Sequence, residues 1–143
     1  PGRRRGGCGK RVVFRVPDDD TAPQGEVSLG VQTGRLRHPP EGLFGGRPGR
    51  AARFEVDGKP ADPYALTRLR PGQRVLMEAA GGGGFGNPLE REPELVAKDV
   101  REGYVSEEAA RREYGVELTA GGEADLKATA ELRKRLAAGE SEG

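Results

Sequence analysis

The chain changes its hydrophobic pattern within one stretch, residues 73–102, which read QRVLMEAAGGGGFGNPLEREPELVAKDVRE. Residues 73–78 place apolar side chains at every second position, which predicts a β-strand. Residues 93–102 space their apolar side chains by three and four positions, which predicts a helix. The segment between them, 81–88, is mostly glycine and carries neither pattern. A strand region is thus followed by a helical region, the order typical of an α+β fold.

The chain before this stretch has the same strand-like character. Apolar side chains at every second position, bounded by turn-forming residues, predict three more strands at 11–16, 26–33 and 53–56. The dipeptide Asp57-Gly58 predicts a tight turn after the last of them. Residues 38–50 form a long loop rich in Gly and Pro. We therefore expect a β-rich part of about four strands with two glycine-rich loops.

The chain after this stretch is predicted to be helical. Ser106 is a good N-cap for a short helix over 106–113, and Gly115 suits the position just past its end. A third helix over 123–138 has a thin apolar stripe. Two short helices and a weak C-terminal helix therefore complete the expected α+β fold.

Length and composition limit what this chain can bury. Its 143 residues suffice for one ordinary domain, but 34% are apolar, and 24 are Gly and 11 Pro. We expect a small core, with part of the apolar surface covered by the rest of a longer chain or by a partner subunit. The main folded portion is expected to span 1–118, and residues 119–143 to form a helical, loosely packed tail.

Charge and apolar runs argue against two classes of partner. A formal net charge of +1 makes no electrostatic case for nucleic acid, and the single Arg/Gly run at 3–7 lacks interleaved aromatic residues. No apolar run reaches the roughly 18 residues that a membrane span needs. Cys8 is the single cysteine, so no internal disulfide can form. We therefore expect neither a nucleic acid nor a membrane partner, and we expect the cytoplasm as the compartment.

The glycine-rich loop 81–88 is the first candidate site. Consecutive glycines allow backbone N–H groups to turn inward and approach an anion. The loop is no P-loop, because no Lys-Ser/Thr pair follows its last glycine. One interpretation is a tightly turned connection, and the other is contact with substrate or phosphate. The residues predicted for such contact are Gly82, Gly83, Gly84, Phe85, Gly86 and Asn87.

The loop 38–50 is the second candidate. Leu43-Phe44 stands between glycines and has the character of an apolar plug that packs on a neighbouring domain. Arg47 and Arg50 have the chemistry to hold a carboxylate or a phosphate, although surface arginines are usually only solvated. We select Arg47 as the side chain most suited to contact substrate or phosphate.

Other catalytic chemistries find little support. His38 and Cys8 are the single residues of their kinds, so a zinc cluster cannot form from them and a Ser-His-Asp triad lacks a nucleophile motif near its histidine. The run at 18–20, three successive Asp, is interpreted as a solvated turn rather than a cation site. No spacing singles out a pair of carboxylates. The catalytic residues therefore stay unknown, and no metal site is predicted within this segment.

Three segments, taken together, resemble the C-terminal end of the hydantoinase B/5-oxoprolinase family. They read PGRRRGGCG at 1–9, GLFGGRPG at 42–49 and GGGGFGNPLER at 81–91, and the resemblance continues to about residue 118. The family more often has Tyr and Asp where this chain has Phe85 and Asn87. It also favours an aromatic residue at position 4 and an aliphatic one at position 8.

The resemblance implies a role in a larger enzyme. Family members act with an A-type subunit in ATP-dependent opening of cyclic amides, and relatives carboxylate ketones. ATP is then expected on the A-type subunit or domain and a divalent metal outside this segment, with neither bound by this segment alone. The chain resembles roughly the last quarter of a member. The implied partners are the A-type subunit, the upstream part of the B-type subunit and a small-molecule substrate, and the segment alone is expected to be inactive.

Alternatives remain open at this point. The chain is also compatible with a ketone carboxylase subunit, or with a non-catalytic interaction module that has lost the chemistry. If the loop 81–88 contacts substrate or phosphate, replacing Gly83 and Gly84 with Val in the full complex is expected to abolish ATP-coupled turnover while leaving subunit assembly intact.

Overall fold

The structure, a computed structural model, describes residues 1–22 and 25–139. They form two units, and each unit is assembled from segments distant in sequence. The β unit, as we call it, consists of Gly7–Pro40 and Gly49–Gly82. The helical unit consists of Pro1–Gly6, Glu41–Pro48 and the chain from Gly83 onward.

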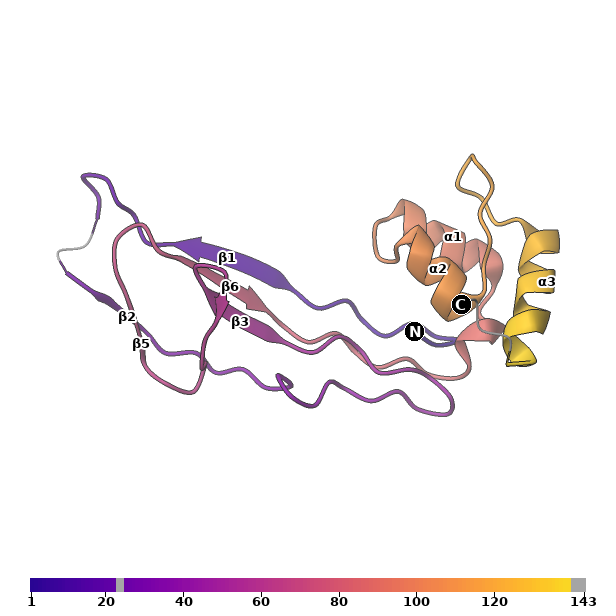
Figure 1. Cartoon of the computed structure of the whole chain (residues 1–143), viewed down its shortest axis with the longest axis horizontal. Coiled ribbons are helices and arrows are strands. Elements are labelled where there is room, and N and C mark those ends of the chain that lie inside the picture. Colours follow the sequence, from indigo (N-terminus) through magenta and orange to yellow (C-terminus); the bar gives the residue numbers. More distant parts are fainter. Residues whose placement is uncertain (23–24, 140–143) are drawn as a thin grey trace. The chain divides into compact units, whose positions relative to one another are not determined.

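The β unit contains two antiparallel sheets (Figure 1). The larger has the strand order β1-β6-β3-β4, formed by β1 (Arg11–Arg15), β6 (Arg74–Glu78), β3 (Arg53–Val56) and β4 (Lys59–Pro60). The smaller pairs β2 (Val27–Leu29) with β5 (Thr67–Leu69). The four predicted strands are confirmed as β1, β2, β3 and β6, with β2 shorter than expected. Strands β4 and β5 were not predicted.

A tight turn at Asp57-Gly58 joins β3 to β4, as predicted. Both residues have positive φ, 48° and 75°, the backbone that a two-residue type I′ hairpin requires. The Asp57 carboxylate accepts hydrogen bonds from the Arg74 backbone N–H and from Gln73 Nε2, both at 2.8 Å. These bonds favour the ionised form and lower the pKa of Asp57, the Arg74 N–H contributing most.

The two sheets of the β unit share one small core. Val16, Phe54, Leu69 and Val75 are buried in it, and partly buried side chains from both sheets surround them: Val27, Leu29, Val31, Leu36, Val56, Ala61 and Met77. Phe54 lies on β3 and Leu69 on β5, so this core joins the two sheets.

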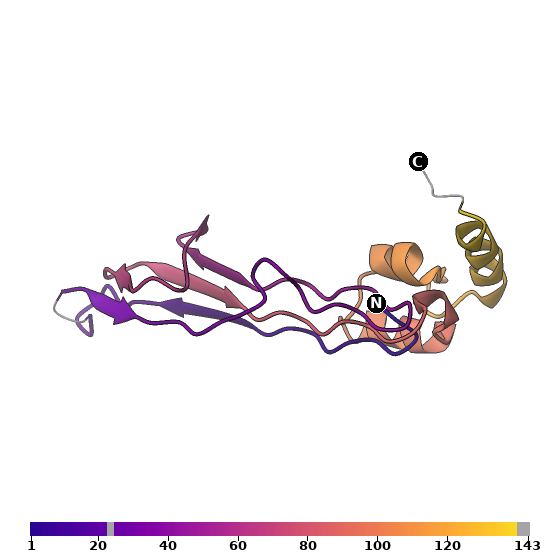
Figure 2. The ribbon, with the colours of Figure 1, turned by 90° about the horizontal axis from the view of Figure 1, so that it is seen from below.

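The helical unit contains a short 3₁₀ turn, η1 (Pro88–Glu90), and three helices, α1 (Pro93–Arg101), α2 (Glu107–Tyr114) and α3 (Leu126–Ala137) (Figure 2). The predicted caps of α2 are confirmed. Ser106 Oγ accepts a hydrogen bond from the Ala109 N–H at 3.1 Å, and Gly115 ends the helix in the left-handed conformation at φ 60°. The α+β class is therefore confirmed.

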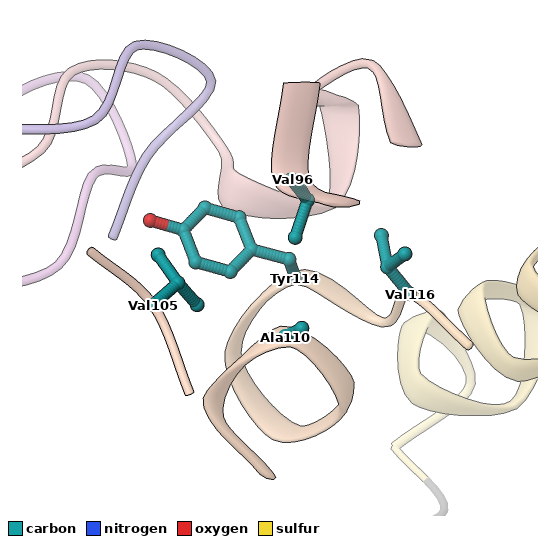
Figure 3. Close-up of a cluster of buried hydrophobic side chains, with 5 residues drawn as sticks. All are labelled: Val96, Val105, Ala110, Tyr114 and Val116. Atoms are coloured by element: carbon teal, nitrogen blue, oxygen red, sulfur yellow. The ribbon is translucent and has the colours of Figure 1, made fainter. Parts of the chain in front are cut away.

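The core of the helical unit gathers around Tyr114, which is 2% exposed. Figure 3 shows its ring between Val96 of α1 and Val105, with Ala110 and Val116 also in the cluster. These apolar side chains fix α1 against α2.

Helix α3 is held more firmly than its thin apolar stripe predicted. Leu132 is 2% exposed, and the Thr129 hydroxyl accepts a hydrogen bond from the Glu117 N–H at 3.0 Å. The Arg133 guanidinium donates to the carbonyls of Tyr114 at 3.1 Å and Arg91 at 2.7 Å. The described part of the tail therefore belongs to the helical unit, a difference from the loose packing expected for 119–143.

Candidate functional site

The three motif segments of the sequence meet in the helical unit. Phe85 exchanges two backbone hydrogen bonds with Arg4, at 2.9 and 3.0 Å. On the other side, the Leu43 N–H donates to the Gly84 carbonyl and the Gly86 N–H donates to the Leu43 carbonyl, both at 2.9 Å. The backbones of 1–6, 41–48 and 83–87 thus run side by side, an arrangement that we call the glycine junction.

Glycines are required in this junction because the backbones approach too closely for side chains. A Cβ added at Gly84 would lie 1.7 Å from the Pro1 carbonyl oxygen, and one at Gly83 would lie 1.9 Å from that of Glu41. A Cβ at Gly46 would lie 2.0 Å from the Gly84 carbonyl oxygen. Real Cβ atoms essentially never come within 3.0 Å of such atoms. The junction therefore exists only with glycine at these positions.

Four of the amide groups expected to face an anion, those of Gly82, Gly84, Phe85 and Gly86, donate hydrogen bonds within the chain instead. Gly82 N–H donates to Gly7 within the β unit at 2.8 Å, and Gly84 N–H donates to Arg47 at 3.0 Å. The amides of Phe85 and Gly86 donate across the junction. An anion that contacts any of these four amides would have to replace its hydrogen bond. Contact between this loop and a ligand stays a prediction, and it now rests mainly on the side chains of the loop.

Two of the predicted side chains also have structural partners. Asn87 Oδ1 accepts a hydrogen bond from the Leu89 N–H at 3.0 Å, which caps η1. Arg47, 47% exposed, forms an ion pair with Glu113 of α2. Burial would raise the pKa of Glu113, but hydrogen bonds from Arg47 and Arg112 outweigh it, and the net shift of this pKa is downward. Both side chains keep polar atoms near the surface of the junction.

Sequence reasoning missed a buried carboxylate beside the junction. Asp99 on α1 is 6% exposed and accepts hydrogen bonds from Arg5 Nε at 3.0 Å and Arg91 Nη2 at 2.9 Å. Arg91 also donates to the Arg3 carbonyl at 3.2 Å, and the Arg5 guanidinium lies 4.8 Å from the centroid of the Tyr104 ring. This network ties the N-terminal segment to α1. The separation of 94 positions between Arg5 and Asp99 hid it from the sequence.

A shallow, mainly cationic cavity of about 460 Å³ opens next to this network. It is lined by Arg3, Arg4, Arg5, Arg91, Glu90, Glu92 and Leu95. The cavity offers charge-assisted hydrogen-bond donors to an anionic group. It brings together none of the residues predicted to contact substrate or phosphate.

The family resemblance implies a divalent metal that is bound outside this segment. Across residues 1–22 and 25–139, no three His, Cys, Asp or Glu side chains are grouped so that they could hold a metal ion. In the same residues, no helix has the length and apolar character to cross a membrane.

Comparison with known proteins identifies the family. The sequence model of the hydantoinase B/oxoprolinase family matches residues 1–88, which include all three segments of the glycine junction. The chain belongs to this family. The resemblance drawn from the three motifs is therefore confirmed.

The family relatives are much longer than this chain. A protein of Pseudomonas sp. (strain NS671), named as the B component of a D-/L-hydantoinase, is 34% identical over 142 residues, which cover 94% of this chain and 23% of that protein. The crystal structure of an ATP-dependent caprolactamase from Pseudomonas jessenii matches with a TM-score of 0.72 and 31% identity, covering 93% of this chain and 24% of that one. The chain thus spans about a quarter of these relatives.

A second solved structure links the fold to a different reaction. Acetone carboxylase in its nucleotide-free form matches with a TM-score of 0.54 and 25% identity, over 72% of this chain and 19% of that one. The helices after residue 88 lie beyond the family model, but the hydantoinase and caprolactamase matches extend over nearly the whole chain. The helical unit is therefore shared with longer family members.

Proposed function

We propose that this chain is the C-terminal part of the B-type subunit of an ATP-dependent cyclic-amide hydrolase. The observation that carries the proposal is the match to the ATP-dependent caprolactamase over 93% of the chain at a TM-score of 0.72. Caprolactam is a cyclic amide, and so are hydantoins, the substrate class named for the NS671 relative. Both names point to ring opening at an amide bond.

Within such an enzyme, the glycine junction forms part of the active-site wall or of the interface with the A-type subunit. Three backbones that pack directly against one another at their glycines give a rigid surface. A rigid surface is what holding a substrate in position requires. Asn87 and Arg47 are the side chains on this surface that we assign to substrate or phosphate contact, and residues 82–86, Phe85 among them, are assigned through their backbone. The glycines Gly82, Gly83, Gly84 and Gly86 set its shape.

ATP is assigned to the A-type subunit or domain, and a divalent metal to residues outside this segment. ATP supplies the driving force for opening the amide when it is bound there. The amides of Gly82, Gly84, Phe85 and Gly86 donate to the chain's own carbonyls, which supports placing the nucleotide elsewhere. We also propose a cytoplasmic location, because the reaction consumes ATP and the single Cys8 allows no internal disulfide.

The experiment that tests this function uses the complete B-type subunit containing this chain, co-expressed with its A-type partner. ADP release and ring opening are measured with caprolactam, 5-oxoproline and hydantoin as separate substrates. We expect ADP release that depends on the amide and on both subunits. Absence of amide-dependent ADP release with every cyclic amide would contradict the proposal.

Arg47 offers a matched pair for the site assignment, because Arg50 lies in the same predicted loop. Arg47→Ala is expected to lower kcat/KM, whereas Arg50→Ala, which removes a side chain with no assigned contact, is expected to leave it near the original value. Equal effects of the two substitutions would remove Arg47 from the proposed site. Ion-pair loss alone is controlled by Glu113→Gln, which removes the partner of Arg47 but keeps the guanidinium.

Ketone carboxylation is the second candidate function, supported by the match to acetone carboxylase. In that case ATP consumption would depend on acetone together with bicarbonate and not on a cyclic amide. The same preparation, assayed for loss of ATP with both substrate sets, separates the two reactions. A complex that consumes ATP with neither set would favour a non-catalytic interaction module.

A further inference from the structure

An apolar patch stands exposed on the glycine junction. It consists of Leu43, Phe44 and Phe85, whose exposed fractions are 61%, 81% and 47%. The rings of Phe44 and Phe85 contact each other, with centroids 5.1 Å apart and planes tilted by 56°. Aromatic pairs of this geometry are favourable when buried, yet here both rings face outward.

The pairing of the backbones places the patch and one arginine on the same face. Leu43 lies directly opposite Phe85 in a parallel bridge, and Arg4 lies opposite Phe85 in an antiparallel bridge. Side chains of directly opposed residues project from the same side of a sheet. Arg4 therefore stands at the rim of the apolar patch. Within residues 1–22 and 25–139, no carboxylate lies within ion-pairing distance of Arg4.

The backbone at Phe44 is held in a conformation that a large side chain rarely adopts. Its φ is 51°, in the left-handed region. The flanking bonds hold it there: the Gly46 N–H and the Gly86 N–H both donate to the Leu43 carbonyl at 2.9 Å. Strain of this kind persists only where the surrounding structure sustains it, and it is concentrated at functional sites. Here it presents an aromatic ring outward.

We propose that the apolar patch docks onto the upstream part of the same B-type subunit, against an apolar surface with a carboxylate facing Arg4. This inference rests on the proposed function. Three apolar side chains are far fewer than the roughly 20–30 residues a side of a stand-alone protein interface. Such a small patch suits a contact that chain continuity already holds at high effective concentration. The matched relatives have about three quarters of their length outside the region that this chain covers.

The test places a photo-crosslinking benzoylphenylalanine at Phe44 in the complete B-type subunit, purified with its A-type partner. The matched control carries it at Tyr64, an aromatic residue of the β unit that is 72% exposed in a polar turn. We expect a crosslink from position 44 to a B-type peptide upstream of this chain, and a much weaker one from position 64. The crosslink is expected to be lost in the Arg4→Glu, Phe85→Ser background, which removes the rim charge and one ring.

Crosslinks to any other partner would contradict the proposed docking. Crosslinks to the A-type subunit, to a second copy of this chain, or to nothing would overturn it, and so would equal yields from positions 44 and 64. A second readout needs no substitution: hydroxyl-radical labelling of Phe44 and Tyr64 in the native complex, each divided by the labelling of the same residue in the unfolded chain, should be lower for Phe44. A normalised labelling of Phe44 equal to or above that of Tyr64 would contradict burial.

Failure of the docking is distinguishable from failure of the proposed function. Intact mass and amide-dependent ADP release are measured on the same preparation. A B-type polypeptide several times longer than 143 residues that releases ADP, but crosslinks elsewhere, leaves the function standing and removes the docking. A preparation in which this chain is part of no longer B-type polypeptide, and in which no ADP is released, would contradict both the docking and the proposed function.

Discussion

Replacing Gly84 with Ala should open the glycine junction. The added Cβ would lie 1.7 Å from the Pro1 carbonyl oxygen, half the 3.4 Å at which ordinary contact begins. The atoms that this Cβ would meet belong to the backbone of Pro1 and Gly2, so no side chain can rotate away to make room. The segments at 1–6 and 83–87 must therefore move apart.

The cost can be worked out from the bonds that the movement stretches. Inserting a methyl group into a packed site costs about 1–3 kcal/mol. Arg4 and Phe85 also exchange two backbone hydrogen bonds between these segments, at 2.9 and 3.0 Å. Losing these two hydrogen bonds costs about 1 kcal/mol each, which brings the total to about 3–5 kcal/mol. That is a large part of the roughly 5–15 kcal/mol by which domains are stable.

Native-state hydrogen exchange on the complete subunit measures this cost locally. The amides of Arg3, Arg4 and Phe85, whose hydrogen bonds join the two segments, should exchange much faster in Gly84→Ala. The matched control is Gly121→Ala, because a Cβ there meets only the Thr119 hydroxyl, at the ordinary distance of 3.7 Å. Unchanged protection of the junction amides in Gly84→Ala would refute the reasoning. Val at Gly83 or Gly84 adds more atoms than Ala at the same close contacts. These distances therefore disagree with the expectation that the Val substitutions leave subunit assembly intact.

Three further changes probe the helical unit. Asp99→Ala leaves the Arg5 and Arg91 charges without this buried partner and should lower the free energy of unfolding in urea by about 3–5 kcal/mol. The control Glu102→Ala removes an exposed ion pair with Lys98 and should lower it by about 0–1 kcal/mol. Glu113 has a lowered folded pKa, so its stabilisation is present above the ordinary glutamate pKa of about 4.3 and is lost as pH falls through the folded value. Glu113→Gln should therefore be less stable than the original protein at pH 6, and the difference should shrink below pH 4; a constant difference would rule out this linkage. Ser106→Ala should cost about 1 kcal/mol by removing the cap of α2, seen as a lower urea midpoint with an unchanged slope.

Local patterns predicted the elements whose signals are local. Ser106 and Gly115 marked the ends of α2, and Asp57-Gly58 marked a hairpin, because caps and tight turns depend on neighbouring residues. Strand β4 has two residues and ends in Pro60, and β5 has three. Such short segments carry no period that can be read. They become strands only because β3 and β2 lie beside them.

The candidate site was harder to predict because a glycine run has two physical uses. A glycine that lets an anion approach the backbone and one that lets another backbone approach look the same in sequence. Gly83 and Gly84 meet the carbonyls of Glu41 and Pro1, residues more than 40 and 80 positions away in the chain. Such partners belong to tertiary structure. The same limit hid Asp99, whose two arginine partners come from different segments.

The glycine junction positions both the proposed substrate site at Arg47 and the proposed docking patch at Phe44, and substitutions can distinguish the two. It fixes the backbone that displays Phe44 and, through the Arg47 carbonyl, the segment that carries the Arg47 guanidinium. Gly84→Ala should therefore weaken docking and lower kcat/KM together, because one rigid element positions both. Phe44→Ser removes an exposed ring without touching that element, so it should weaken docking while the bonds around Arg47 persist. If Phe44→Ser instead lowered kcat/KM with no change in crosslinking or labelling at the patch, the ring would belong to the substrate site rather than to a contact between parts of the subunit.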